Sequence, residues 1–321
     1  MLNFLAAFVI IYIGTRPVSF AFADMGLYAI DFQRYAAGEP LNTDKDVWFE
    51  IFIQTCSRIM SVEMFFFLCA VLYVLPLYVV SKKWFGNYAF YGFAMFVVSM
   101  SFWGYGTNGI RNGIATSLFL LAVSQSSVLL TVVWIFVAIS IHKSMLLPTV
   151  AYIMSRVYKN PTAYFAGWFV CIPLSLAAGG AFESFFASSG LVEDDRLAAY
   201  LGGESLDLLH EIKVGFRWDF LIYSATGAFA GLYFIVKHKF EDATYKLLYC
   251  TYLTANAVWI LVIRANFSNR FAYLSWFMLA ALIIYPLLKS RIFTNQHRIV
   301  AIILLIYFAF TYSLDVKMLM R

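Results

Sequence analysis

Long apolar stretches separated by short polar segments dominate the pattern of the chain. A membrane-spanning helix needs about 20 mostly apolar residues, with a range of roughly 17–25. On this criterion the pattern predicts an all-α integral membrane protein with about eleven transmembrane helices, or roughly 10–12 when weak edges are allowed for. The whole chain, 1–321, is expected to form a single polytopic domain. The helices are expected near residues 2–22, 62–80, 88–103, 111–125, 127–141, 143–157, 163–187, 217–236, 245–263, 270–288 and 299–316.

Composition excludes several other classes of protein. Hydrophobic residues make up 62% of the 321 residues and charged residues 13%, against roughly 45–50% and 25% in average globular domains. A soluble domain of this size cannot bury so much apolar surface. A cytosolic enzyme, a secreted disulfide scaffold and a disordered protein are therefore excluded. The four cysteines include no CxxC motif, so neither a redox motif nor a zinc site is indicated. We expect no metal site, no cofactor and no nucleic-acid partner, although carboxylates alone could hold a cation.

The distribution of lysine and arginine predicts the orientation of the helices. With a cytoplasmic N-terminus and strict alternation, the cytoplasmic loops contain only two acids, Glu241 and Asp242, but many basic residues, as the positive-inside rule requires. Two segments on the opposite side are long, 23–61 and 188–216, and long loops are often functional. We therefore expect the function on the outer face. The basic residues of the cytoplasmic loops are Lys82, Lys83, Arg156, Lys159, Lys237, Lys239, Lys246, Lys289, Arg291 and Arg298.

The first outer segment contains a regular set of polar and aromatic residues. Asp24, Tyr28, Asp31 and Tyr35 are spaced by four, three and four positions, which places two carboxylates and two phenols on one helical face. Carboxylates accept hydrogen bonds from sugar hydroxyls, and aromatic rings stack on sugar C–H faces, so this face suits sugar recognition. The alternative is an amphipathic helix lying in water on the membrane surface. A second apolar helix is expected over residues 48–60.

A glycine-rich turn lies at residues 104–113, on the outer side between two predicted spans. It includes a GxGxxG pattern, but a dinucleotide site is excluded because no βαβ pattern surrounds it. Backbone N–H groups at the start of the next helix, with Asn108, Arg111 and Asn112, predict an anion-binding site. The alternative is a tight hairpin in which Arg111 only extends to the membrane surface.

Three polar residues, His142, Lys143 and Ser144, interrupt the apolar stretch 127–157. Such a cluster at the membrane surface has to face water, a partner or a cavity. Histidine can accept a proton near neutral pH, which makes His142 a candidate general base. The alternative is a simple polar turn between two helices.

Further arginines are predicted at the outer ends of later helices. Arg217 and Asp219 start one span, and Arg264 and Arg270 flank a short outer turn. Together with Arg111, four arginines are expected at a similar membrane depth. Arginine binds phosphate through a rigid bidentate fork. The pattern predicts a lipid-linked diphosphate as ligand, with its anionic head at the interface and its hydrocarbon chain among the helices.

Several of these motifs resemble one family. Asp24 followed by Tyr28, the segment IRNGIATSLFLLA, the His-Lys-Ser turn and the segment GFRWDFLIYSATGAFAGLYF resemble the EpsG-like group of bacterial polysaccharide polymerases, which are related in role to Wzy O-antigen polymerases. Arg111, His142 and Ser144 fit the family pattern. The resemblance implies a GT-C-like glycosyltransferase of the bacterial inner membrane with its active site facing the periplasm.

The resemblance also implies a reaction and its partners. A growing glycan is transferred from its undecaprenyl-diphosphate carrier to a new lipid-linked unit, and undecaprenyl diphosphate leaves without a nucleotide sugar or a metal. Membrane lipid and a polysaccharide chain-length regulator are the other expected partners. His142 is the first candidate base and Asp24 the second. Diphosphate binding is expected from Arg111, Arg217, Arg264 and Arg270, and substrate binding from Tyr28, Asp31, Tyr35, Asn108, Asn112, Lys143, Ser144 and Asp219.

Two other functions compete with the polymerase. An O-antigen ligase would transfer the glycan to lipid A core. A transporter or flippase for a lipid-linked glycan would place ionisable residues along a path through the membrane, with paired broken helices. The predicted charges gather at one face instead, which favours the enzyme.

Overall fold

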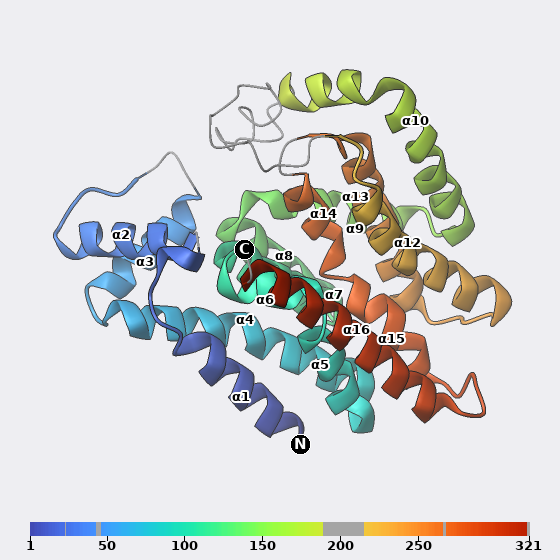
Figure 1. The fold of residues 1–321 in the computed structure, drawn as a ribbon, viewed down its shortest axis with the longest axis horizontal. Helices are drawn as coiled ribbons and strands as arrows, with labels where there is room; N and C mark the ends of the chain where they lie inside the picture. Colours follow the sequence, from blue (N-terminus) through green and yellow to red (C-terminus); the bar gives the residue numbers. More distant parts are fainter. Residues whose placement is uncertain (23, 43–45, 189–214, 266–267, 320–321) are drawn as a thin grey trace. The chain divides into compact units, whose positions relative to one another are not determined.

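The computed structural model describes residues 1–22, 24–42, 46–188, 215–265 and 268–319. In that part of the chain every regular element is helical, which confirms the predicted fold class (Figure 1). The chain divides into two compact units. Unit 1 comprises Met1–Met145 and Ile284–Arg321, and unit 2 comprises Leu146–Ile283. The single polytopic domain over 1–321 stays a prediction.

Unit 1 is built around one long helix, α4. It packs against α1, α5 and α7, and α7 in turn packs against α8. Helix α7 also packs closely against α6, which requires a small residue: a Cβ atom at Gly113 would lie 2.9 Å from the backbone oxygen of Tyr105 in α6. The helices of this unit are α1 (Leu2–Gly14), α2 (Asp24–Ala36), α3 (Val47–Ser57), α4 (Val62–Phe85), α5 (Ala89–Val97), α6 (Met100–Thr107), α7 (Ile110–Val123), α8 (Val128–Ile141) and α16 (Gln296–Leu319), with short turns η1 (Phe20–Phe22), η2 (Gly86–Tyr88) and η3 (Lys143–Met145).

Unit 2 is organised around α13, which contacts α9, α10, α12 and α14. Close contacts again depend on small residues, since a Cβ atom at Gly231 would lie 2.2 Å from the Tyr249 ring. The helices are α9 (Leu146–Val157), α10 (Pro161–Ser188), α12 (Trp218–Leu232), which continues as the π-helical turn η4 (Tyr233–Lys237), α13 (Ala243–Leu261) and α14 (Asn269–Trp276); α15 (Leu279–Lys289) runs from unit 2 into unit 1.

A buried amide joins the helices of unit 2. Asn256 on α13 is 0% exposed, and its Oδ1 accepts a hydrogen bond from Trp168 Nε1 at 2.7 Å. Its Nδ2 donates to Ser224 Oγ at 3.1 Å and to Ser275 Oγ at 2.9 Å. Each of these four residues comes from a different helix. A buried polar group with all its partners in place fixes one arrangement of the helices around it.

Replacing Asn256 with alanine is expected to destabilise unit 2. It leaves Trp168 Nε1 without its acceptor, and an unsatisfied buried polar group costs about 1–3 kcal/mol. The midpoint of thermal unfolding of the purified chain should therefore fall. The control is Thr254→Ala on the same helix, because that hydroxyl bonds only to its own helix, at Cys250 O. Equal midpoints for the two variants would show that the amide does not stabilise the unit.

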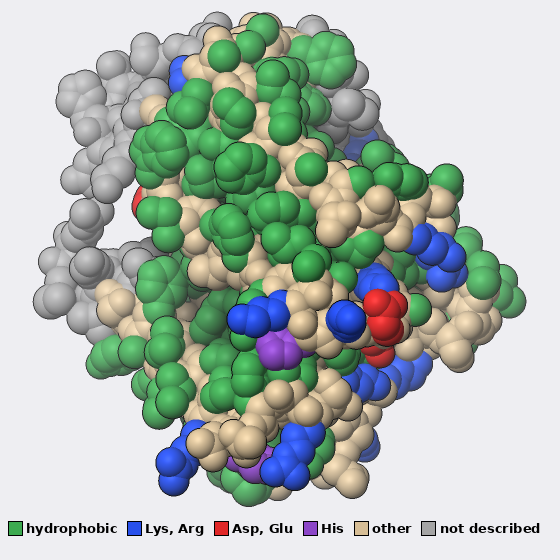
Figure 2. Space-filling model, turned by 90° about the vertical axis from the view of Figure 1, so that its right-hand side faces the viewer, with side chains coloured by type: hydrophobic (Ala, Val, Ile, Leu, Met, Phe, Trp, Pro, Cys, Tyr) green, Lys and Arg blue, Asp and Glu red, His purple; other side chains and the backbone are tan. Residues whose placement is uncertain are grey.

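Five of the described helical segments are long and apolar enough to cross a membrane: Val62–Val97, Pro161–Phe186, Trp218–Lys237, Asn269–Lys289 and Gln296–Ser313. Three shorter apolar helices are Leu2–Gly14, Ile110–Val123 and Val128–Ile141. Hydrophobic side chains cover most of the face drawn in Figure 2, with charged side chains at scattered positions between them. The chain is a helical membrane protein, while the count of about eleven spans and the GT-C-like architecture stay predictions.

Three predicted spans differ from the structure. The span expected near 270–288 is divided into α14 and α15. The span expected near 88–103 is divided into α5 and α6, because Ser99 adopts an extended backbone conformation between them. The span expected near 2–22 is helical only to Gly14 before the turn η1. In the outer segment 23–61 both expected helices are present as α2 and α3. Most of the other long segment, 188–216, lies outside the described residues.

Candidate functional site

The predicted polar and aromatic face of α2 packs against α3. Tyr28, Asp31 and Tyr35 are all buried, and the Tyr28 ring meets the Phe49 ring of α3 edge-on, with centroids 5.3 Å apart. These three side chains of α2 are therefore not exposed to water, as they would be if α2 were an amphipathic helix lying in water on the membrane surface. The phenols connect two helices of the outer segment.

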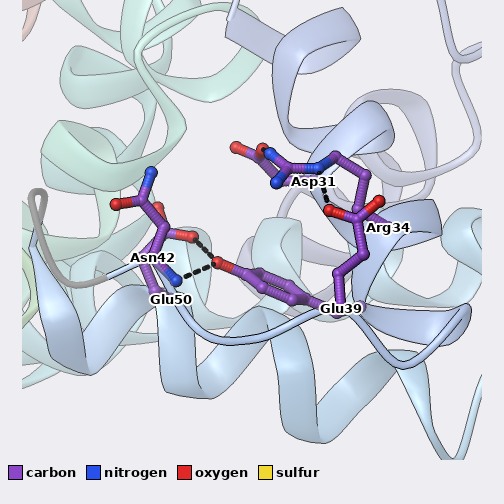
Figure 3. Close-up of polar contacts among 6 residues, drawn as sticks. Asp31, Arg34, Glu39, Asn42 and Glu50 are labelled. Carbon is purple, nitrogen blue, oxygen red and sulfur yellow. Dashed lines mark hydrogen bonds and ion pairs between the residues drawn. The ribbon is translucent and has the colours of Figure 1, made fainter.

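Tyr35 joins α2 to α3 through its hydroxyl group. It donates to Glu50 Oε2 at 2.7 Å and accepts from the backbone N–H of Asn42 at 3.1 Å. Burial, opposed by the Asn42 N–H and assisted by the bond to Glu50, raises the pKa of Tyr35 to about 12, so the phenol remains a donor at neutral pH. Figure 3 shows these hydrogen bonds together with a second set of polar contacts. In that set Arg34 pairs with Asp31 at 3.5 Å and with Glu39 at 2.7 Å.

The central feature of unit 1 is a carboxylate that receives hydrogen bonds from two other parts of the chain. Asp46 Oδ2 accepts from His142 Nδ1 at 2.7 Å and from Arg111 Nη1 at 3.0 Å. Its Oδ1 accepts from the backbone N–H of Lys143 at 3.1 Å. We call Asp46, Arg111, His142 and Lys143 the Asp46 cluster. It brings together the start of α3, the start of α7 and the turn after α8.

Local structure explains why these groups can meet. Asp46 is the N-cap residue of α3, but its side chain makes no capping hydrogen bond to that helix, so both oxygens are available to other segments. Arg111 is the second residue of α7, and His142 ends α8 in an extended conformation. Three helix ends therefore present a carboxylate, a guanidinium and an imidazole to one point.

Asp46 is ionised in this setting. Burial favours the neutral acid, but the hydrogen bond from His142 Nδ1, the positive charge of Arg111 and the Lys143 N–H together outweigh it. They hold the pKa of Asp46 below its usual value. An ionised carboxylate can only accept, so Nδ1 of His142 carries the proton. In the neutral imidazole, Nε2 then has a free lone pair and can accept a proton.

Arg111 is held by two aromatic rings as well as by Asp46. Its Cζ atom lies 5.7 Å from the Tyr28 ring centroid and 5.9 Å from that of Phe49. A guanidinium over aromatic faces is further stabilised by cation–π attraction. The Arg111 side chain is 19% exposed and that of His142 is 16% exposed, so both can be reached from outside the unit.

Other predicted site residues lie around the Asp46 cluster. Asn112 Oδ1 accepts from Ser144 Oγ at 3.2 Å, which links α7 to the turn that carries Lys143. Asn108 Oδ1 accepts from the backbone N–H of Asp24 at 3.1 Å, which links the glycine-rich turn to the start of α2. The contacts thus join Tyr28 to the Asp46 cluster, Asn112 to Ser144 and Asn108 to Asp24, whereas Asp31 and Tyr35 bond to other residues of the outer segment. Their roles in binding and catalysis stay predictions.

The remaining predicted residues lie in unit 2. Arg217 forms a bidentate pair with Asp219, at 2.9 and 2.7 Å, and its Cζ lies 3.5 Å from the Phe220 ring centroid. Arg264 Nη2 donates to the backbone oxygen of Leu176 at 3.1 Å. Arg270 is in the first turn of α14. The convergence of all four arginines stays a prediction.

Sequence reasoning missed Asp46 itself. An acid directly before an apolar helix is a typical N-cap signal, and this signal could have drawn attention to the residue. The sequence does not reveal that its side chain faces away from its own helix toward His142. In the described part of the chain, no group of three or more His, Cys, Asp or Glu residues is placed to hold a metal ion.

A comparison with protein families gives one match over nearly the whole chain. The model of the EpsG family matches residues 1–319. No curated protein and no solved structure matches the chain.

Proposed function

The chain belongs to the EpsG family, the family of Wzy-type polysaccharide polymerase-like proteins, and on this premise we propose that it is a membrane glycosyltransferase. The proposed reaction joins undecaprenyl-diphosphate-linked oligosaccharide units into O-antigen or a related surface polysaccharide. We place it on the periplasmic face of the bacterial inner membrane, with the N-terminus in the cytoplasm. Family membership supports the coarser description of a polysaccharide polymerase-like membrane protein.

The observation that carries the proposal is the contact between His142 Nδ1 and Asp46 at 2.7 Å. A carboxylate that holds Nδ1–H fixes the imidazole so that Nε2 acts as a general base, as in hydrolase triads. In the proposed step the acceptor hydroxyl loses its proton to Nε2, and its oxygen bonds to the anomeric carbon of the donor sugar. The bond from that carbon to the diphosphate oxygen breaks, and the electron pair leaves with undecaprenyl diphosphate. Asp24 is the alternative base.

The leaving group needs positive charge as its bond breaks. Arg111 and Lys143 in the Asp46 cluster can supply it, and Arg217, Arg264 and Arg270 are the further cations expected from the sequence. Asn108, Asn112 and Ser144 are the residues proposed to position the donor or acceptor sugar, and hydrogen bonds join Asn108 to Asp24 and Asn112 to Ser144. Tyr28, Asp31, Tyr35 and Asp219 are the other proposed substrate contacts. Chemistry of this kind uses no step that depends on a resident cofactor.

The glycan ladder of a host that lacks this gene tests the proposed function. If the chain is the polymerase, surface polysaccharide separated by size should collapse to core carrying a single repeat unit, and a plasmid copy should restore the ladder. Long polymer retained on its undecaprenyl carrier would identify a ligase instead. Repeat units that accumulate only on the cytoplasmic side would identify a transporter.

A further inference from the structure

Helix α10 is interrupted in its second half. Its backbone leaves the helical region at Ala178, with φ −136° and ψ 23°, after Pro173 and just before the pair Gly179–Gly180. Proline and adjacent small residues are the usual causes of such a kink, and Figure 1 shows α10 changing direction along its length. The backbone oxygen of Leu176, beside the interruption, accepts from Arg264 Nη2.

Three polar atoms beside this interruption are shielded from water and lack partners. Ser175 Oγ, Glu183 Oε1 and Arg264 Nε have no hydrogen-bond partner within the described residues, and Ser175 is 0% exposed. Buried polar atoms are nearly always hydrogen-bonded, so three unpaired atoms in one place call for a ligand. An ionisable residue such as Glu183 in a candidate membrane span is by itself a sign of function.

Gly179 shows that two of these atoms, Arg264 Nε and Ser175 Oγ, adjoin one space. A Cβ atom built on Gly179 would lie 3.6 Å from Arg264 Nε and 3.8 Å from Ser175 Oγ. Burial acts most strongly on the Glu183 carboxyl group, and the charge of Arg264 acts on it as well, yet no ion pair within 4.0 Å joins these two residues in the described part of the chain. A donor and an acceptor of opposite charge are thus held near each other without direct contact.

We propose that Ser175, Glu183 and Arg264 form a subsite for the hydroxyl groups of a sugar of the glycan substrate; this assignment rests on the proposed function. A sugar hydroxyl both donates and accepts, so it can donate to Glu183 and accept from Arg264, while Ser175 does either. The ring of Phe216, 6.0 Å from Arg264 Cζ, adds an aromatic surface for sugar C–H groups.

The carboxylate of Glu183 determines the class of ligand. An ionised Glu183 would repel a diphosphate bound to Arg264, because like charges repel strongly in a poorly solvated site. For Arg264, the sugar subsite therefore replaces the diphosphate-binding role that was expected from the sequence. In this proposal, residues of unit 2 help to bind the glycan.

Two adjacent glycines provide a matched pair of variants. In Gly179→Ala the new methyl group makes only ordinary contacts, 3.5 Å from Arg264 Cδ, so the fold is retained while the space between the polar atoms is filled. In Gly180→Ala the methyl group meets nothing within 4 Å. Both changes replace glycine with alanine and so raise helix propensity by the same amount. A difference in oligosaccharide binding between the two variants therefore reports on the subsite.

The probe is the free repeat-unit oligosaccharide, released by mild acid from the lipid-linked units of a host that lacks the polymerase gene. Its binding to the full chain in lipid nanodiscs is measured by saturation-transfer NMR, with inorganic diphosphate as a second probe. For Gly179→Ala we expect the dissociation constant of the oligosaccharide to rise by about tenfold or more, the equivalent of losing one buried hydrogen bond. For Gly180→Ala we expect no change.

Glu183→Gln tests the charge. It should weaken oligosaccharide binding, because hydrogen bonds to an ionised acceptor are about twice as strong as neutral ones, and it should leave diphosphate binding unaffected. Equal oligosaccharide binding by the Gly179 and Gly180 variants would overturn the subsite, and so would tighter diphosphate binding by Glu183→Gln. The binding assay needs no turnover, so the two proposals can fail separately. If gene deletion leaves the glycan ladder intact while Gly179→Ala still weakens oligosaccharide binding by the purified chain, the polymerase function is rejected and the subsite is retained.

Discussion

Replacing His142 with alanine is expected to slow chain extension by about 10²–10⁴-fold, the usual contribution of a general base. The imidazole is fixed by Asp46, and its Nε2 is the atom we assign to accept the hydroxyl proton. The measurement is the initial rate of polymer formation from lipid-linked repeat units by the purified chain. Unfolding midpoints of variant and unmutated chain should be compared in parallel, so that lost activity is not confused with lost structure.

The same argument predicts the behaviour of Asp46→Asn. Asparagine keeps the size of the side chain, but it can donate to Nδ1 and so favours the tautomer in which Nε2 carries the proton. In a serine protease triad this change costs about 10⁴-fold. Because His142 and Asp46 act as a unit, the double variant should be little slower than either single variant.

Asp242→Asn is the control for this pair of variants. Asp242 is also an N-cap aspartate, at the start of α13, where its carboxylate accepts from the Tyr245 N–H. Its replacement should leave the rate close to that of the unmutated chain. If His142→Ala loses less than about tenfold, general-base catalysis by this residue is excluded on magnitude, and Asp24 becomes the candidate to test.

Short-range spacing predicted the helices of the outer segment well. The spacing of Asp24, Tyr28, Asp31 and Tyr35 fixes which side chains share a face, and α2 confirms the helix. Spacing does not reveal what that face contacts, and the buried position of Tyr35 depends on Glu50, 15 residues later. Likewise, the residues on both sides of Ser99 are apolar, so the break between α5 and α6 leaves little trace in the hydrophobic pattern.

The candidate site could be predicted only in part, because its residues lie far apart in the sequence. Arg111 and His142 each stand out as polar groups at the end of an apolar stretch, where a charge has to face water, a partner or a cavity. Their common partner, Asp46, is 65 residues from Arg111 and 96 residues from His142. Only the packing of α3 and α7 against α8 brings these residues together, and no local pattern in one sequence encodes that.

Replacing Arg111 with alanine is expected to reduce chain extension by about 10²–10³-fold, the typical effect of removing one group that stabilises developing negative charge. Arg111 lies close to the proposed base, since both bond to the same oxygen of Asp46. Its removal also takes one cation from a buried carboxylate, which destabilises the fold. Arg111→Lys separates the two effects because it retains the charge, although it loses the planar group that lies over the Tyr28 and Phe49 rings.

We therefore expect Arg111→Lys to unfold close to the unmutated chain and to lose less activity than Arg111→Ala, with the loss in kcat rather than in KM. A change confined to transition-state stabilisation lowers kcat and kcat/KM together, whereas loss of ground-state binding raises KM. Arg156→Ala is the matched control, because Arg156 also lies over a tyrosine ring, at 5.7 Å from that of Tyr152. Near-normal polymer from Arg111→Ala, measured against this control, would reject Arg111 as the group that stabilises the diphosphate.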